Sequence, residues 1–413
     1  MGGGLGMNVA VVSSGHIPSQ WAHSINTVKT ANAFSKIGHN VEILTVERFL
    51  EKREKQKINN VHRFYGIGDA IKIAYFKDNP LFYFEEINSP IHYFSEGIKR
   101  TTNGRIRYVS DPEKRISEYC RKNSMDLSYC RAYRTAYYNV KNGIPTILES
   151  HTPNTKHPEL RRVIKLSHSE YFEGLVTISD ILKQNFIAAG VPEDKVLVLD
   201  DGVDIASFRN LPSKEEIRGM FALPRDRKMV VYSGSLFPDK GIEHILLVAR
   251  NLPDVLFLLV GGREQQIKMW EKYVDSCKIE NVQFTGFVGT SKVPLYLKAA
   301  DVLIMPYKTD QEIKIMDINT TSPLKLFEYM AAKKPIVSSA IPAISRTIVH
   351  EVDGLLAKPN DIQELTHFVE LVLEDEQLAE KIAENAYTKV QDYDWKNRCE
   401  KILRQLTLMG GVR

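Results

Sequence analysis

The sequence predicts an α/β protein built from two doubly wound parallel-sheet domains. Short apolar runs alternate with longer helical stretches from Asn8 onward, which is the pattern of parallel strands joined by helices. This rhythm stops near Asp201 and restarts at Met229. With 413 residues, the chain has room for two or three domains of about 150 residues each. We therefore expect one domain in each half of the chain.

The first half opens with a strand–helix–strand unit, in which Gly38 ends a helix over residues 22–37. Its predicted strands are Asn8–Ser13, Val41–Thr45, Ile71–Phe76, Leu127–Cys130, Thr146–Glu149, Gly174–Ile178 and Val196–Leu199. The segment from residue 78 to 123 interrupts this rhythm with many aromatic and basic residues. We interpret it as an insertion packed on the core, or alternatively as a contact for an acceptor or a membrane.

The irregular stretch Asp201–Arg227 contains Gly202, Pro212 and Pro224, and it predicts the connection between the domains. Within it we expect one short helix, Lys214–Met220. The strands predicted for the second half are Met229–Ser233, Val255–Val260, Asn281–Thr285, Val302–Met305, Pro335–Ser338 and Gly354–Leu356.

The composition is that of a folded protein, with 43% apolar and 26% charged residues. Uncharged apolar runs such as Val255–Val260 are far shorter than the roughly 18 to 20 residues of a membrane-spanning helix. The four cysteines show no paired Cys-x-x-Cys spacing, which argues against zinc and disulfides. The start MGGGLG does not look like a secretory signal. We expect a cytoplasmic protein.

Basic residues are in excess only in the first half, where 27 Lys and Arg face 21 Asp and Glu. This excess predicts either an ordinary solvated surface or a face for an anionic substrate or the inner face of an acidic membrane. Nucleic acid is a poor partner, because no dense Lys/Arg block with interleaved aromatics occurs.

Candidate ligand-binding residues follow the strands, since ligands of parallel α/β domains bind at the carboxyl ends of the strands. After the first strand, a loop with Gly15 and Ser19 leads into a helix, without the G-x-G-x-x-G spacing of a dinucleotide site. In the second half, Gly234 and Ser235 follow a strand, and Lys240 stands at the entrance of the next helix. A lysine at a helix start suits a phosphate group.

The strongest local pattern runs from Ser322 to Ala332. Ser322 is expected to cap a helix whose first residue is Pro323, which would leave the amides of Leu324 and Lys325 free for an anion. Lys325 and Glu328 stand three residues apart and share one face of that helix. Ser322 and Lys325 also match the S-x-x-K motif of serine acyl-enzymes, but the companion motifs Lys-Thr-Gly and Ser-Asp-Asn are missing.

His151 directly follows another predicted strand end, Thr146–Glu149. A lone histidine there is either structural or part of an active site. The residues themselves leave both interpretations open.

In their order and spacing, these motifs resemble those of retaining glycosyltransferases of family 4, which have the GT-B fold of two facing Rossmann-like domains with a C-terminal helix that crosses back to the first. The resemblance runs nearly end to end. The residues that carry it are Pro18, Ser19 and Ala22; Gly38 to Val41; Asp201 to Asp204 and Phe208; Gly234, Lys240 and Gly241; Ala300, Asp301 and Pro306; Ser322 to Ala331; Lys334 to Val337; and Gly354 to Leu356.

The resemblance implies an acceptor-side domain over residues 1–205, a donor-binding domain over 206–390 and a returning helix over 391–413. It further implies that Lys240 and the amides near Leu324 and Lys325 hold a donor diphosphate and that Glu328 binds the ribose. Phe287 and Val288 would lie against the base. His151 would sit beside the transferred sugar, and Gly15, Ser19, Gly234, Ser235, Ser322 and Pro323 would complete the donor site.

Two positions depart from the family pattern. The family has Arg directly after the loop glycine, where this chain has Ser235, and Lys325 is a candidate to compensate. The family also has a glutamate where this chain has Thr320, and the neighbouring Asp317 is a candidate substitute.

The function expected from the resemblance is retaining transfer of a hexose from a UDP- or GDP-sugar to a hydroxyl of a glycan or a lipid-linked acceptor, as in polysaccharide biosynthesis. No metal or other cofactor is expected, because lysines and helix amides would neutralise the diphosphate and the one Asp-x-Asp, Asp392 to Asp394, does not follow a strand. The alternatives are a sugar-nucleotide 2-epimerase of the same fold and a nucleotide-sugar-binding protein without catalysis.

Overall fold

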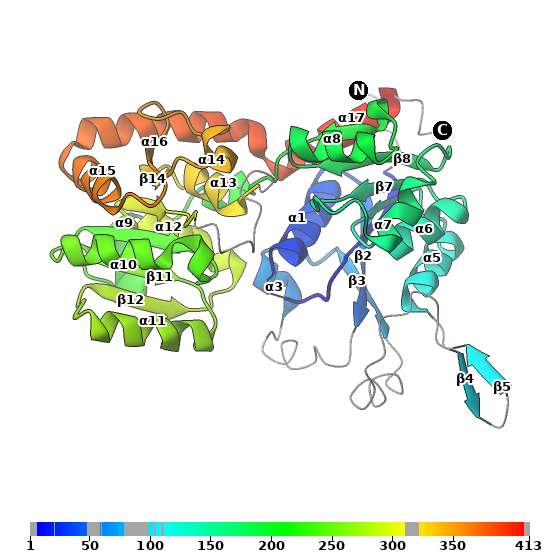
Figure 1. Ribbon diagram of the computed structural model, residues 1–413, viewed down its shortest axis with the longest axis horizontal. Helices are drawn as coiled ribbons and strands as arrows, with labels where there is room; N and C mark the ends of the chain where they lie inside the picture. Colours follow the sequence, from blue (N-terminus) through cyan, green and yellow to red (C-terminus); the bar gives the residue numbers. More distant parts are fainter. Residues whose placement is uncertain are drawn as a thin grey trace. The chain divides into compact units, whose positions relative to one another are not determined.

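The computed structural model describes residues 6–19, 21–47, 58, 60–77, 99–102, 105–108, 111–309 and 322–408. The chain divides into two compact units, of which unit 1 comprises Met1–Asp200 and Trp395–Arg413 and unit 2 comprises Asp201–Asp394 (Figure 1). Asp317, Thr320 and much of the segment 78–123 lie outside the described residues. In the part of the chain that is described, no helix combines the length and apolar character needed to cross a bilayer.

Unit 1 contains a seven-stranded parallel sheet with the order β3-β2-β1-β6-β7-β8-β9. Its strands are β1 (Asn8–Val12), β2 (Asn40–Glu47), β3 (Lys72–Lys77), β6 (Leu127–Cys130), β7 (Thr146–Glu149), β8 (Phe172–Thr177) and β9 (Val196–Val198). Its helices are α1 (Ala22–Lys36), α3 (Val61–Tyr65), α5 (Pro112–Lys122), α6 (Tyr133–Lys141), α7 (Pro158–Ile164), α8 (Asp180–Ala188) and α17 (Trp395–Leu408). The last helix of the chain, α17, packs against α1, so the C-terminus belongs to unit 1.

A separate hairpin in unit 1 falls within the 78–123 segment that the sequence pattern left unassigned. It pairs β4 (Lys99–Thr102) with β5 (Arg105–Tyr108) in antiparallel fashion. Neither strand was predicted, because both carry basic residues and lack the apolar runs that identify buried strands.

Unit 2 contains a six-stranded parallel sheet with the order β12-β11-β10-β13-β14-β15. Its strands are β10 (Met229–Ser233), β11 (Leu256–Val260), β12 (Val282–Gly286), β13 (Val302–Met305), β14 (Ile336–Ser339) and β15 (Leu355–Ala357). Its α-helices are α9 (Lys214–Met220), α10 (Ile242–Asn251), α11 (Glu264–Ser276), α12 (Val293–Ala299), α13 (Leu324–Ala331), α14 (Pro342–Ser345), α15 (Ile362–Glu374) and α16 (Glu376–Val390).

The strands β10, β11, β13 and β14 of unit 2 are buried on both faces, as the sequence pattern predicts for a doubly wound sheet, whereas the edge strand β12 is only partly buried. Along β10, Met229 and Val231 join one apolar core cluster, whereas Val230 and Tyr232 join a second. Alternate residues of a strand point to opposite faces, so the two clusters lie on the two sides of the sheet. This confirms the predicted fold class.

Candidate functional site

Two lysines and a tyrosine ring form a cluster in unit 2, beyond the carboxyl ends of β10 and β13. Lys240 ends a short 3-10 turn, Pro238–Lys240, and its Nζ lies 3.1 Å from Asp239 Oδ2. Lys325 is the second residue of α13. The Nζ atoms of Lys240 and Lys325 lie 5.3 and 5.9 Å from the centroid of the same ring, Tyr307. Two positive groups thus converge on one aromatic side chain, and we refer to these residues as the cation cluster.

Tyr232 holds the amine of Lys325 in place. Lys325 Nζ donates a hydrogen bond to the Tyr232 hydroxyl at 2.8 Å and lies 4.2 Å from the centroid of that ring. The same hydroxyl donates to the main-chain oxygen of Ser235 at 2.7 Å. Among the described residues, no carboxylate forms an ion pair with Lys325. Its close contacts are a hydroxyl oxygen and aromatic rings, while Glu328 and Asp239 act on its charge from farther away.

Burial, followed by the charge of Lys240, holds the pKa of the Lys325 amine well below its ordinary value of 10.5. Burial likewise raises the pKa of Tyr232 well above its ordinary value of 10.0, so this hydroxyl stays neutral and can act as donor or acceptor. Lys240 and Lys325 repel each other when both are charged. An anion that binds between the two amines reduces this repulsion, which makes its binding favourable. The cluster has the electrostatics of a phosphate-binding site.

Gly234 has a structural reason to be glycine. Its φ is +135°, and a Cβ at this position would come within 2.9 Å of Lys325 Nζ. A larger residue would therefore be strained and would also displace the amine. The predicted residues Gly234, Ser235, Lys240 and Lys325 therefore lie close together, around the rings of Tyr232 and Tyr307.

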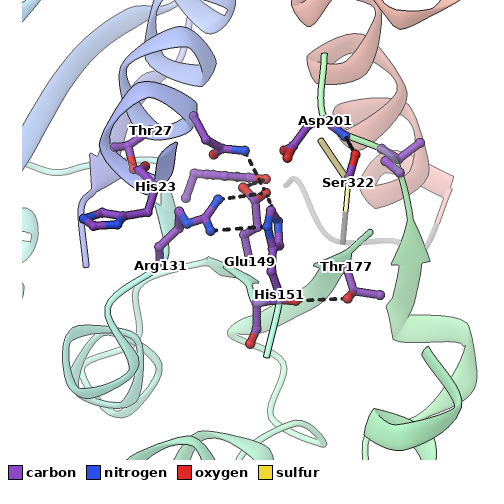
Figure 2. A network of polar contacts seen from close by, with 12 residues as sticks. His23, Thr27, Arg131, Glu149, His151, Thr177, Asp201 and Ser322 are labelled. Atoms are coloured by element: carbon purple, nitrogen blue, oxygen red, sulfur yellow. Dashed lines mark hydrogen bonds and ion pairs between the residues drawn. The ribbon is translucent and has the colours of Figure 1, made fainter. Parts of the chain in front are cut away.

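The start of α13 differs from the prediction. Ser322 is not the cap: Pro323 occupies the N-cap position and makes no side-chain cap bond. Ser322 Oγ instead accepts a hydrogen bond from the Asp201 amide at 3.1 Å, which uses the hydroxyl that would have capped the helix (Figure 2). The first residues of α13 are still Leu324 and Lys325, whose amides lack partners within the helix by helix geometry.

The remaining predicted residues of unit 2 lie on α13 and after β12. Glu328 is partly buried on α13, and its charge acts on Lys325. Phe287 is 39% exposed directly after β12, whereas Val288 packs partly against the core. Their contacts with a donor stay predictions.

In unit 1, Gly15 and Ser19 are engaged within the fold. The Gly15 oxygen accepts a hydrogen bond from Thr45 Oγ1 at 2.9 Å. Ser19 is fully buried, and its hydroxyl donates to Ser24 Oγ at 2.8 Å. Tyr65 bonds to both main-chain polar groups of Ser19. These bonds shape the loop after β1, and a donor contact at Gly15 or Ser19 stays a prediction.

His151 belongs to a network around Glu149, the last residue of β7 (Figure 2). His151 Nε2 lies 2.7 Å from Glu149 Oε1, and Arg131 Nη1 lies 3.2 Å from the same oxygen. Arg398 of α17 places Nη2 3.1 Å from it, and the Tyr129 hydroxyl donates to the other carboxylate oxygen. Glu149 is 1% exposed. Burial alone would raise its pKa, but Arg398 and Arg131 outweigh burial and hold the pKa well below 4.5.

Several of these residues were not predicted from the sequence. No sequence signal singled out Tyr232, Tyr307 or Glu149. These residues lie in or directly after apolar strands, where a side chain normally packs in the core. Arg131 directly follows a predicted strand, so its position at a carboxyl end could have marked it. Arg398 is separated from Glu149 by 249 positions, and no local pattern could have paired them.

The two units each contain a doubly wound parallel sheet, and the cation cluster lies after the strands of the second. Comparison with solved structures shows that this α/β architecture is the GT-B fold. A structure of Anabaena HepE in complex with UDP-glucose matches with a TM-score of 0.67 at 18% identity, covering 97% of this chain and 100% of that one. At this identity the match establishes the fold.

Sequence comparison points to glycosyltransferases. Residues 213–389 match the family Glycosyl transferases group 1. An uncharacterized glycosyltransferase of Methanocaldococcus jannaschii is 28% identical over 234 residues, 54% of this chain and 57% of the relative. The processive diacylglycerol alpha-glucosyltransferase of Acholeplasma laidlawii is 23% identical over 297 residues, 70% of this chain and 83% of the relative. The chain spans about half the length of the first curated relatives it matches.

Proposed function

We propose that the protein is a retaining glycosyltransferase that moves a hexose from a nucleotide-diphosphate donor, a UDP- or GDP-sugar, to an acceptor hydroxyl. The observation that carries this proposal is the cation cluster, in which Lys240 and Lys325 converge on Tyr307 and no carboxylate of the described residues forms an ion pair with Lys325. The group 1 match and the UDP-glucose held by the HepE structure support a nucleotide sugar as the ligand.

The proposed chemistry requires a diphosphate to leave while positive charge develops on the sugar. Lys240, Lys325 and the first amides of α13 neutralise the departing diphosphate. The acceptor oxygen bonds to the anomeric carbon on the face that the diphosphate leaves, and its proton passes to the departing phosphate oxygen. Because the leaving phosphate takes the acceptor's proton, no carboxylate nucleophile is needed, and His151 contacts the sugar. Glu328 binds the ribose, and Phe287 and Val288 flank the base.

The acceptor is a glycan or a lipid-linked molecule in this proposal. The diacylglycerol glucosyltransferase relative supports a lipid acceptor, and the basic residues of the first half would favour an acidic membrane surface. We propose a cytoplasmic protein that works at the inner face of the membrane.

A thermal-shift screen with UDP-, GDP- and ADP-sugars tests the donor class. A ligand at 100 times its Kd adds about 2.7 kcal/mol to the free energy of unfolding. Product analysis with the best donor then separates three outcomes: a transferred sugar supports the proposal, a 2-epimer indicates an epimerase, and binding without turnover indicates a binding protein. No shift with any nucleotide sugar would overturn the proposal.

Transfer activity is expected to survive EDTA. The charge of the donor diphosphate is met by lysines and helix amides, so removing divalent cations leaves the binding groups in place. The measurement is the initial rate with and without chelator, with the donor at saturation. Loss of activity that Mg²⁺ or Mn²⁺ restores would contradict the metal-independent mechanism.

A further inference from the structure

The C-terminal helix places one charged side chain at the carboxyl ends of three strands of unit 1. Arg398 is 4% exposed. Its Nε donates to the Asp200 oxygen at 2.9 Å, Nη1 donates to the Tyr129 hydroxyl at 3.2 Å, and Nη2 lies 3.1 Å from Glu149 Oε1. One guanidinium thereby joins β6, β7 and the segment after β9, where the sheet carries His151.

The helix α17 has an apolar face that contributes to its docking independently of this arginine. The helix already buries Trp395, Cys399 and Ile402, each 4% exposed or less. An apolar face of this kind holds a helix by itself. A buried ion pair adds little net stability compared with apolar residues of similar volume. The position of Arg398 therefore calls for an explanation other than helix attachment.

The bonds of Glu149 fix the state of the His151 ring. A carboxylate whose pKa lies well below 4.5 is ionised and only accepts hydrogen bonds, so His151 Nε2 must carry the hydrogen that points at Glu149. Arg131 Nη2 lies 3.4 Å from His151 Nδ1, and a guanidinium only donates. The geometry thus describes one ring orientation and one tautomer, with the lone pair on Nδ1.

We infer that Arg398 is a positioning residue for the proposed transfer reaction, acting through Glu149 to hold the His151 ring in this orientation and tautomer. The inference rests on the proposed function for its catalytic meaning, because His151 is the residue proposed to contact the sugar. Without Arg398, Glu149 keeps Arg131 as its one guanidinium partner, beside the Asn26 amide at 3.4 Å and the Tyr129 hydroxyl, which itself loses the hydrogen bond from Arg398. The carboxylate then loses its fixed direction, and the His151 ring loses its anchor.

The first test reads the His151 ring directly by ¹⁵N NMR, with the signals assigned by comparison with His151→Gln. The variants are Arg398→Met, which removes the charge, and Arg398→Gln, which keeps donors for the main-chain oxygens. Lys401→Met is the matched control, because Lys401 is an exposed residue of the same helix. We expect the Nε2–H signal pattern in the wild type and in the control. In both Arg398 variants we expect a mixture of tautomers.

An unchanged His151 signal in a folded Arg398 variant would overturn the inference. Circular dichroism and melting curves establish which variants fold, and Arg398→Gln carries the test if Arg398→Met does not. A purely structural role would lower the melting temperature and leave the His151 tautomer unchanged, so the two roles are separated.

The second test uses the donor found in the screen. Displacing a catalytic group by up to about 1 Å from its productive position costs about 10- to 100-fold in rate. We therefore expect kcat to fall by about that factor in Arg398→Gln, with the KM for the donor nearly unchanged. Equal losses in kcat and donor affinity would contradict positioning of His151. If the wild type turns over no nucleotide sugar, the proposed function fails, while the NMR result still decides whether Arg398 controls His151.

Discussion

Replacing His151 with alanine is expected to reduce kcat for the intact sugar nucleotide by about 10²–10³-fold, the loss seen when one transition-state donor is removed from an active site. Binding of the bare nucleoside diphosphate should stay nearly intact. The physical reason is that His151 lies in unit 1, fixed by Glu149, whereas the cation cluster lies in unit 2. A group that contacts the reacting sugar acts mainly in the transition state.

The contrasting variants are Lys240→Ala and Glu328→Ala, which should weaken binding of the bare nucleoside diphosphate by about 10- to 150-fold, since each removes a charged contact of about 1.5–3 kcal/mol. Lys268→Ala is the matched control, because Lys268 is an exposed lysine of α11 in the same unit. Calorimetry with the diphosphate and steady-state rates with the sugar nucleotide give the two measurements. If His151→Ala weakens diphosphate binding as much as Lys240→Ala, or leaves turnover untouched, the assigned roles are wrong.

The sequence predicted the strands well because their physical signal is local. Leu127–Cys130 and Met229–Ser233 match their observed bounds, since a parallel strand buried on both faces reads as a continuous apolar run. The prediction for residues 174–178 was displaced from β8, Phe172–Thr177, because β8 begins with Phe172 and the buried charged residue Glu173.

The candidate site was only partly accessible from the sequence. Lys240 and Lys325 could be selected because each follows a strand or starts a helix. The neighbours that set their electrostatics, Tyr232 and Tyr307, could not, since a tyrosine in or after an apolar strand normally packs in the core. The cap of α13 was assigned wrongly because Ser322 bonds to Asp201, a partner 121 positions away.

Binding of a nucleoside diphosphate is expected to take up protons in the pH range between the lowered pKa of Lys325 in the free protein and its higher pKa in the complex. In the free protein its pKa lies well below 10.5, because of burial and then Lys240. A bound diphosphate adds negative charge to that of Glu328 and Asp239, which raises the pKa of Lys325 again. As pH rises through the lowered pKa of the free protein, Lys325 becomes neutral before binding and charged after it. Proton uptake therefore grows with pH in that window, and affinity falls.

Titration calorimetry over a series of pH values above about 7, in buffers of different ionisation enthalpy, measures this uptake. The phosphate itself contributes little there because its own second pKa is about 6. The wild type should take up a substantial fraction of a proton per diphosphate bound. Lys325→Met should bind about 10- to 150-fold more weakly, with the uptake abolished, because the methionine fills a similar volume and cannot titrate. Lys268→Met, on the exposed face of α11, should behave as the wild type.

Uptake that persists in Lys325→Met would assign the proton to another group. Tight binding with no proton uptake in the wild type would mean that the Lys325 amine is already charged before the anion binds. The rings of Tyr232 and Tyr307 and the Tyr232 hydroxyl would then be sufficient to stabilise that charge.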